Sequence, residues 1–253
     1  MPPRLDQIGY WSEVKLDIVR EYAATYSTVL SAQRGLRGHL YIDGFAGSGV
    51  HISKRTGSYV SGSPLNALLV EPPFREFHLI DMDGDKASAV RRLTADRSDV
   101  FVHEGNCNQI LLETVFPRAR YDDYRRALCL LDPYGLHLNW EVIHTAGQMR
   151  SIEIVLNFSV MDMNMNVLRR TPDKPQSSQE ERMDAFWGDR SWRDAAYVKT
   201  RGLFDEMEEK VSNEAVARAF QKRLRDVAGL KFVPDPIPMR NSKGAVIYYL
   251  FFA

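Results

Sequence analysis

Two short motifs combine residue types that could bind a cofactor and position a reacting group. The first is a glycine-rich loop introduced by an acidic residue, Asp43-Gly44-Phe45-Ala46-Gly47-Ser48-Gly49. The second is Asp132-Pro133-Tyr134-Gly135. Each follows a short apolar run typical of a buried strand. Because open α/β sheets bind ligands at the carboxyl ends of their strands, the motifs predict a site at that edge.

The glycine loop favours some cofactors over others. Its glycines would allow a tight turn and a close approach of a ligand to the backbone. A Walker loop requires Lys and Ser/Thr after the last glycine, but Val50 and His51 stand there, which argues against ATP or GTP hydrolysis. A dinucleotide fingerprint requires a small residue where Ile52 stands, so NAD binding is a weaker alternative. A purely structural turn remains the other alternative.

Polar residues also follow the next two predicted strands. Asp81 could accept hydrogen bonds from both hydroxyls of a ribose. Asp83 competes for that role, or begins a helix through favourable placement at its positive end. After the third strand, Asn106 could pair with an adenine edge or serve only as a turn residue. We favour Asp81 over Asp83 and leave both alternatives for Asn106 open.

The second motif is suited to methylation of an exocyclic amine. That reaction requires the nitrogen lone pair to point at the methyl carbon, and Asp132 with the Pro133 carbonyl could achieve this by binding the amine protons. Tyr134 could stack on a base. The alternative is a strand-ending Asp-Pro turn with Tyr134 in the core.

The elements that must position these motifs alternate between strands and helices. This alternation predicts one doubly wound α/β domain over residues 1–253, with an N-terminal helical segment at 1–35 and an insertion at 161–203 that is a lid or a small subdomain. The predicted helices cover residues 10–30, with Ser12 as N-cap, and 204–228, with Gly229 at the C-cap. The predicted strands are 39–43, 77–81, 100–103, 127–132, 152–157, 232–233 and 245–252.

Two groups of residues have both a binding and a structural interpretation. The insertion carries Phe186, Trp187, Trp192 and Tyr197, which could stack on bases but which we expect to pack together. Two local basic surfaces are as well explained by solvated helix faces as by an anionic partner. They comprise Arg118, Arg120, Arg125 and Arg126 in one case, and Arg218, Lys222, Arg223 and Arg225 in the other.

The composition narrows the function classes. Lys and Arg together number 33 and so do Asp and Glu, so no overall basic excess indicates a nucleic-acid binder. The two cysteines form no CxxC pair, and the N-terminus lacks an apolar signal core, which predicts a cytoplasmic protein. No apolar run is long enough to cross a bilayer, and the scattered histidines predict no metal site. Because the sequence ends at Ala253 within an apolar strand, we expect further residues beyond it.

Taken together, five motifs make the sequence resemble the three-Cys-motif partner (TcmP) family of the class I methyltransferase superfamily. The resemblance runs from Trp11 to the end, and its marks are Trp11-Ser12-Glu13-Val14-Lys15, Tyr41 to Gly49, Gly62-Ser63-Pro64-Leu65, Leu131 to Gly135, and Met239-Arg240-Asn241-Ser242-Lys243-Gly244. The loop is also similar to that of adenine and guanine amino-methyltransferases, whose second motif reads Asp/Asn-Pro-Pro-Tyr. Here one proline of that motif is missing.

The resemblance implies a Rossmann-like, seven-stranded class I sheet, mostly parallel with an antiparallel last strand. It implies S-adenosylmethionine as cofactor, and Lys15 and Ser63 as residues that could reach its methionine carboxylate. It also implies a radical-SAM-like partner protein that carries the cysteine motif. The predicted cofactor-binding residues are therefore Lys15, Asp43, Gly44, Phe45, Ala46, Gly47, Gly49, Ser63, Asp81 and Asn106, and the predicted catalytic residues are Asp132, Pro133 and Tyr134.

These observations lead to one principal functional hypothesis and two alternatives. The principal hypothesis is an S-adenosylmethionine-dependent methyltransferase that acts on an exocyclic amine of a nucleobase in DNA or RNA. The first alternative is a non-catalytic partner or scaffold for the radical-SAM-like protein. The second is a nicotinamide-dependent oxidoreductase, which depends only on the glycine turn and Asp81.

Overall fold

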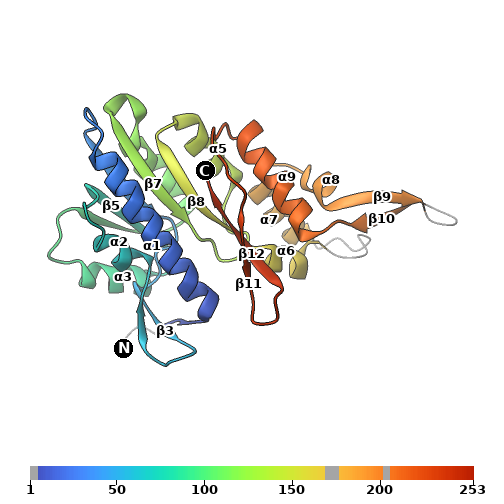
Figure 1. Cartoon of the computed structure of the whole chain (residues 1–253), viewed down its shortest axis with the longest axis horizontal. Coiled ribbons are helices and arrows are strands. Elements are labelled where there is room, and N and C mark those ends of the chain that lie inside the picture. The colour runs from blue at the N-terminus through green and yellow to red at the C-terminus, as the bar shows by residue number, and fades with distance from the viewer. Residues whose placement is uncertain (1–4, 169–176, 202–205) are drawn as a thin grey trace. The chain divides into compact units, whose positions relative to one another are not determined.

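The computed structural model describes residues 5–168, 177–201 and 206–253, and its main feature is a mixed sheet (Figure 1). In these residues the sheet has seven strands in the order β11-β12-β8-β7-β2-β5-β6. Strand β2 pairs in parallel with β5 and β7, β5 pairs in parallel with β6, and β11 pairs antiparallel with β12. The strands are β2 (Gly38–Asp43), β5 (Glu76–Asp81), β6 (Val100–Glu104), β7 (Arg125–Leu131), β8 (Ile152–Phe158), β11 (Ile237–Arg240) and β12 (Val246–Phe252).

This topology confirms the predicted α/β fold with a mostly parallel, seven-stranded sheet that has antiparallel strands at its end. Two smaller sheets accompany it, formed by β1 (Gln7–Ile8), β3 (Val50–Ser53) and β4 (Tyr59–Ser61), and by β9 (Tyr197–Arg201) and β10 (Glu206–Lys210). The helices are α1 (Tyr10–Ser31), α2 (Ser63–Leu68), α3 (Gly84–Leu93), α4 (Cys107–Ile110), α5 (Trp140–Met149), α6 (Val160–Asn166), α7 (Ser177–Trp187), α8 (Trp192–Ala196) and α9 (Asn213–Asp226).

Residue contacts divide the chain into two compact units. The first comprises residues 1–132 and 149–155, and the second comprises residues 133–148 and 156–253. A compact unit is not necessarily an independently folding domain, so the single domain over residues 1–253 stays a prediction. The described part of the insertion, which lacks residues 169–176 and 202–203, belongs to the second unit.

The first unit is built around strands that are buried along most of their length. The apolar side chains of β2, β5 and β7 are inaccessible to solvent, which explains why these strands read as continuous apolar runs rather than alternating ones. Helix α1 buries Leu16, Val19 and Ala23, at the spacing of one helix face. The helix is confirmed, but its N-cap is Gly9, so Ser12 lies within the first turn and does not cap it.

The second unit has an aromatic core. Phe220 of α9 lies 4.6 Å from Phe158, 5.5 Å from Phe251 and 5.6 Å from Phe186, measured between ring centroids. Trp187 and Trp192 are also almost fully buried. Phe186 and Trp187 of the insertion therefore pack into this core, as we expected, and Trp192 and Tyr197 are buried. Such rings bury a large apolar area.

Two predicted elements of the second unit are wrong. Residues 206–210 form β10, which pairs with β9 residue by residue, and the helix begins only at Asn213, where Ser212 caps it (Figure 1). Cross-strand pairing there overrides the helix propensity of the glutamates. Residues 232–233 form no strand, because the Val233 carbonyl accepts a hydrogen bond from the Gln221 side chain instead of joining a ladder.

Neither a membrane span nor a metal cluster is found in the described residues. No helix there combines the length and apolar composition needed to cross a bilayer. No group of three or more His, Cys, Asp or Glu side chains in the same residues could hold a metal ion.

Packing at Gly147 gives a test of the second unit. A Cβ at this position in α5 would lie 2.1 Å from the Ala228 carbonyl oxygen, which also accepts a hydrogen bond from Gln148. Alanine is the better helix former by about 1 kcal/mol, but overpacking costs about 1–3 kcal/mol or more. We therefore expect Gly147→Ala to lower the free energy of unfolding, measured by urea denaturation. Thr145→Ala in the same helix is the control, and a Gly147→Ala protein more stable than wild type would contradict this packing.

Candidate functional site

The glycine loop joins the carboxyl end of β2 to β3 and is held in place by hydrogen bonds that its backbone N–H groups donate. Four consecutive N–H groups donate to acceptors in the protein at distances of 2.8–3.1 Å. The pairs are Gly44 to the Leu130 carbonyl, Phe45 to Asp43 Oδ1, Ala46 to the Ile80 carbonyl, and Gly47 to Asp81 Oδ2. The loop is thus fixed to the ends of β5 and β7.

These hydrogen bonds decide which ligands the loop suits. Walker and dinucleotide loops bind phosphates through free backbone N–H groups. Here the N–H groups from Gly44 to Gly47 are already occupied by protein acceptors. Four of the N–H groups of the loop are therefore not available to a pyrophosphate, which argues against the nicotinamide alternative.

The loop leaves space above its backbone at Gly47. Gly47 and Gly49 have φ values of +64° and +81°, which L side chains rarely adopt. The nearest atom to a Cβ placed on Gly47 would be Cε1 of His51, 3.9 Å away. A ligand could therefore lie against Gly47, as the sequence motif predicts.

Asp43 is fully buried at the start of the loop. It accepts hydrogen bonds from the Phe45 N–H at 3.1 Å and from the Ser63 hydroxyl at 2.6 Å. Burial raises its pKa to about 7, and the charges of Asp132 and Asp81 act in the same direction. Ser63, predicted to reach a methionine carboxylate, holds this carboxyl group in the structure.

Asp81 and Asp83 have different places at the end of β5. Asp81 accepts one backbone hydrogen bond on each oxygen, from Gly47 and from Asp83, both at 2.8 Å. Since a carboxylate has about four lone-pair sites, it retains capacity for a ligand. Asp83 is the N-cap of α3 and accepts hydrogen bonds from the N–H groups of Asp85 and Lys86. The structure thus shows Asp83 in the helix-starting role.

Asp132, at the end of β7, forms an ion pair with Lys15 of α1. The side chains are 27% and 13% exposed, respectively. Two residues predicted for different roles, one catalytic and one cofactor-binding, are therefore brought together. The Lys15 ammonium thus contacts the carboxylate that we predicted to be catalytic.

His51 belongs to this site although the sequence analysis used it only to exclude a Walker loop. Its charged neighbours are Asp6, Lys15, Lys86 and Asp132, and burial lowers its pKa, which favours a neutral ring. The Nδ1 atom is buried and has no hydrogen-bond partner in the described residues. The only signal in the sequence was its position two residues after the last glycine of the loop.

The remaining predicted residues lie at other strand ends. Asn106 is the N-cap of α4 and accepts a hydrogen bond from the Asn108 N–H, so its turn role is observed. In the second unit Pro133 is buried, whereas Tyr134 is 89% exposed. The alternative that places Tyr134 in the core is therefore wrong, and its ring is free to meet a ligand.

Negative charge predominates around the glycine loop of the first unit. The charges of Asp132 and Asp81 both act on Asp43. Those of Asp6, Asp81 and Asp83 act on Lys86. The cations among these groups are Lys15 and Lys86, each in an ion pair with one carboxylate. Such a site stabilises a cationic ligand better than an anionic one.

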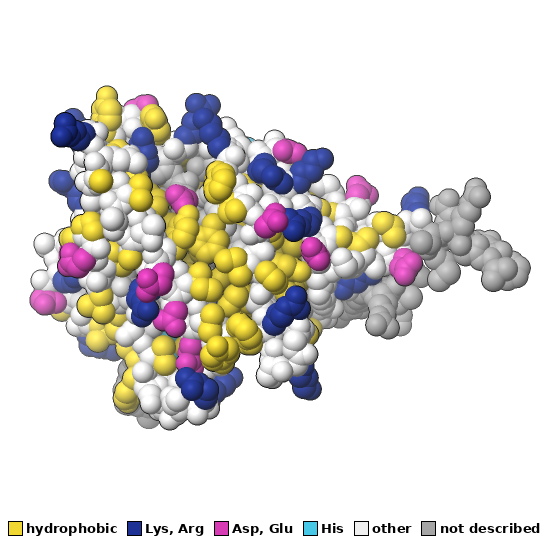
Figure 2. All heavy atoms as spheres, in the orientation of Figure 1, with side chains coloured by type: hydrophobic (Ala, Val, Ile, Leu, Met, Phe, Trp, Pro, Cys, Tyr) yellow, Lys and Arg dark blue, Asp and Glu magenta, His cyan; other side chains and the backbone are white. Residues whose placement is uncertain are grey.

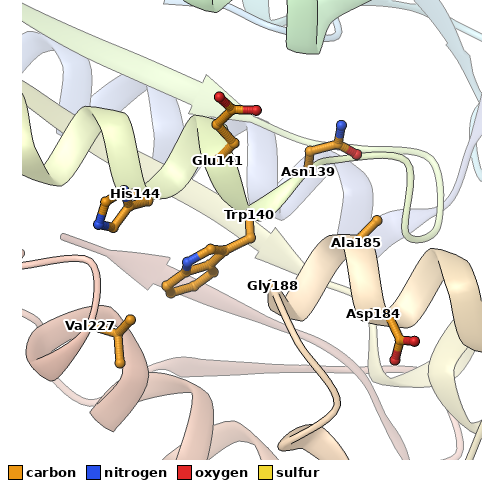
Figure 3. Close-up of a pocket in the computed structure, with 8 residues that line it drawn as sticks. All are labelled: Asn139, Trp140, Glu141, His144, Asp184, Ala185, Gly188 and Val227. Atoms are coloured by element: carbon orange, nitrogen blue, oxygen red, sulfur yellow. The ribbon is translucent and has the colours of Figure 1, made fainter.

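A separate cavity in the second unit contains none of the predicted site residues (Figure 3). It has a volume of about 490 Å³ and is lined by residues of α5, by Asp184, Ala185 and Gly188, and by Val227. Figure 3 shows the side chains of Glu141 and Asn139 on the opposite side of the chain from the Trp140 ring. Because these polar groups do not converge, the cavity does not define a ligand.

Comparisons with known proteins give only distant likenesses. No family model and no curated protein matches the chain. A solved structure of a methyltransferase yhhF from Escherichia coli, described as putative, is 17% identical with a TM-score of 0.39, over 93% of this chain and 85% of that one. An S-adenosylmethionine-dependent methyltransferase from Clostridium acetobutylicum is 13% identical with a TM-score of 0.42, over 94% and 93%. The methyltransferase domain of bacterial CtHen1 is 11% identical with a TM-score of 0.42, over 94% and 98%. Likenesses of this degree do not establish an activity.

The buried Asp43 predicts a specific pH dependence of stability. Its pKa rises from 3.8 to about 7 on folding, so the unfolded chain releases this proton at a lower pH than the folded protein. The stability contributed by protonated Asp43 is complete below about pH 4 and is lost as the pH rises through about 7. Relative to Asp43→Asn, the wild-type free energy of unfolding should fall by a few kcal/mol over this range, at about 1.4 kcal/mol per pKa unit.

Urea denaturation at several pH values measures this difference. The exposed Asp96→Asn is the matched control, which should follow the wild-type pH profile. Parallel profiles for wild type and Asp43→Asn would show that Asp43 has the same proton affinity in both states, contrary to its burial.

Proposed function

We propose that this protein is an S-adenosylmethionine-dependent methyltransferase that acts on an exocyclic amine of a nucleobase in nucleic acid. The observation that carries the proposal is the glycine loop, whose N–H groups from Gly44 to Gly47 are occupied and whose surroundings are acidic. S-adenosylmethionine has a positively charged sulfonium and no phosphate, so it matches both properties. ATP and NAD match neither.

The residues in and beside the loop offer suitable contacts to S-adenosylmethionine as methyl donor. When bound, S-adenosylmethionine supplies an electrophilic methyl group. Its ribose hydroxyls can donate to the remaining lone pairs of Asp81, and the open space at Gly47 admits the chain that carries the sulfur. Asp43 and Ser63 shape the loop from beneath and need not touch the donor.

The acceptor side of the proposal depends on Asp132 and its neighbours in sequence. The Asp132 carboxylate and the Pro133 carbonyl would accept the protons of the amine and so direct its lone pair. Exposed Tyr134 would stack on the base. The same carboxylate forms an ion pair with Lys15, which fixes its position at the end of β7.

Isothermal titration calorimetry tests donor binding. Wild type should bind S-adenosylmethionine and should not bind NAD or ATP at the same concentrations. Asp81→Asn, which retains one acceptor oxygen, should weaken donor binding by about tenfold or more, since a hydrogen bond to a charged group contributes about 1.5–3 kcal/mol. Asp85→Asn, in the first turn of α3, is the control. Absence of binding at millimolar donor by protein with a native circular dichroism spectrum would contradict the proposal.

Transfer of labelled methyl groups to DNA, RNA and protein pools tests the reaction. Loss of a positioned proton acceptor costs about 10²- to 10⁴-fold in rate, so Asp132→Asn should reduce kcat by about that factor while donor affinity changes little. Undiminished labelling by Asp132→Asn would rule out Asp132 as the proton acceptor.

Donor binding by wild type without transfer to any pool would favour the scaffold alternative, and co-purification with a three-Cys-motif protein would support it.

A further inference from the structure

A second cavity, which belongs to the first unit, lies at the amino ends of its strands. It has a volume of about 280 Å³ and is lined by Arg37, Arg118, Arg125 and Asp123. Arg37 directly precedes β2, and Arg125 begins β7, where it is the ladder partner of Gly38. The glycine loop follows the other, carboxyl end of β2. The cavity is therefore separate from the proposed donor site.

Two of the arginines are fixed by one buried carboxylate. Arg118 donates to Oε2 of Glu76 from Nε and Nη2, at 3.0 and 2.9 Å, and Arg125 donates to Oε1 from Nη1 at 3.1 Å. Arg118 also lies 5.2 Å from the centre of the Phe101 ring. Burial of Glu76 would raise its pKa, but the hydrogen bonds and charges of these partners lower it, so the carboxylate stays ionised. The guanidinium groups are thus pre-organised, which reduces the entropy that a ligand must overcome.

Positive charge at this cavity exceeds what Glu76 requires. One guanidinium would neutralise Glu76, yet two bind it, and Arg37 and Asp123 add one charge of each sign to the lining. Two further arginines are adjacent, since Arg75 donates to the Arg37 carbonyl and Arg126 to the Arg125 carbonyl. Figure 2 shows Lys and Arg side chains along the end of the first unit where α1 finishes. In a chain of zero net charge, this is a local basic excess.

The geometry points to a phosphate-binding pocket formed by Arg37, Arg118 and Arg125. Each guanidinium has five N–H donors in a planar fork. The bonds to Glu76 and to the Arg118 carbonyl use four of the ten donors on Arg118 and Arg125. Such forks match the oxygens of a phosphate better than those of chloride or a neutral ligand. Structural neutralisation of Glu76 alone would explain Arg118 or Arg125, but it would not explain Arg37. A free phosphate and a phosphodiester of nucleic acid present the same group.

Binding experiments with defined phosphates test this pocket. Inorganic phosphate, pyrophosphate and a single-stranded oligothymidylate are titrated into the full chain by calorimetry, with sodium chloride at matched ionic strength as the baseline. We expect at least one phosphate compound to bind where chloride does not. Tighter binding of the oligonucleotide would identify a phosphodiester as the ligand, and tighter binding of the small phosphates would identify a free phosphate.

Three exposed side chains provide variants that should not disturb the fold. Arg37→Gln should weaken phosphate binding by about tenfold, the factor that one charge-assisted hydrogen bond commonly contributes. Asp123→Asn should strengthen it, because it removes the negative charge from the lining. Arg92→Gln, an exposed arginine of α3 outside the cavity, should leave it unchanged. Equal effects of Arg37→Gln and Arg92→Gln, or heats no larger than those of chloride, would overturn the proposal.

Discussion

The glycine loop of the first unit depends on hydrogen bonds between its backbone and the ends of β5 and β7. Gly47 binds Asp81, Ala46 binds Ile80, and Gly44 binds Leu130, so the loop can take only one path across these strand ends. That path leaves the N–H groups from Gly44 to Gly47 occupied and the space above Gly47 open. The proposed cofactor follows from this constraint, because a loop with these four N–H groups occupied offers fewer donors to phosphates and is compatible with a sulfonium.

Acidic and basic side chains lie at opposite ends of the strands of the first unit, although the chain has no net charge. The carboxyl ends of β2, β5 and β7 carry Asp43, Asp81 and Asp132, and their amino ends carry Arg37 and Arg125 together with the single acid Glu76. Equal totals of acidic and basic residues conceal this separation. Acidic residues beside the glycine loop suit a cationic methyl donor, whereas guanidinium forks suit an anion. The two proposed sites therefore suit ligands of opposite charge and lie at opposite ends of the strands.

Much of the fold could be predicted from the sequence, because buried parallel strands are short apolar runs whose length and flanking turn residues distinguish them from helices. Strands β2, β5, β6, β7 and β8 were each predicted to within two residues at either end. The strand β10 was not, since Glu206–Lys210 has helix-forming residues and only its pairing with β9 makes it a strand. Hairpin β3–β4 was missed because its few residues carry no clear alternation.

The candidate site was predictable in its positions but not in its partners. Motif spacing brought Asp43, Asp81 and Asp132 to one sheet edge, because parallel strands end there together. The pairing of Lys15 with Asp132 depends on where α1 lies against the sheet, which no local pattern encodes. The same holds for His51, whose position beside the loop follows from the hairpin that was missed.

A crystal structure with S-adenosylhomocysteine bound tests the central claim most directly. The account predicts the ligand at the carboxyl ends of β2 and β5, against Gly47, with its ribose hydroxyls within hydrogen-bond distance of Asp81. A ligand bound elsewhere, or crystals of folded protein that remain free of it at saturating concentration, would contradict the account.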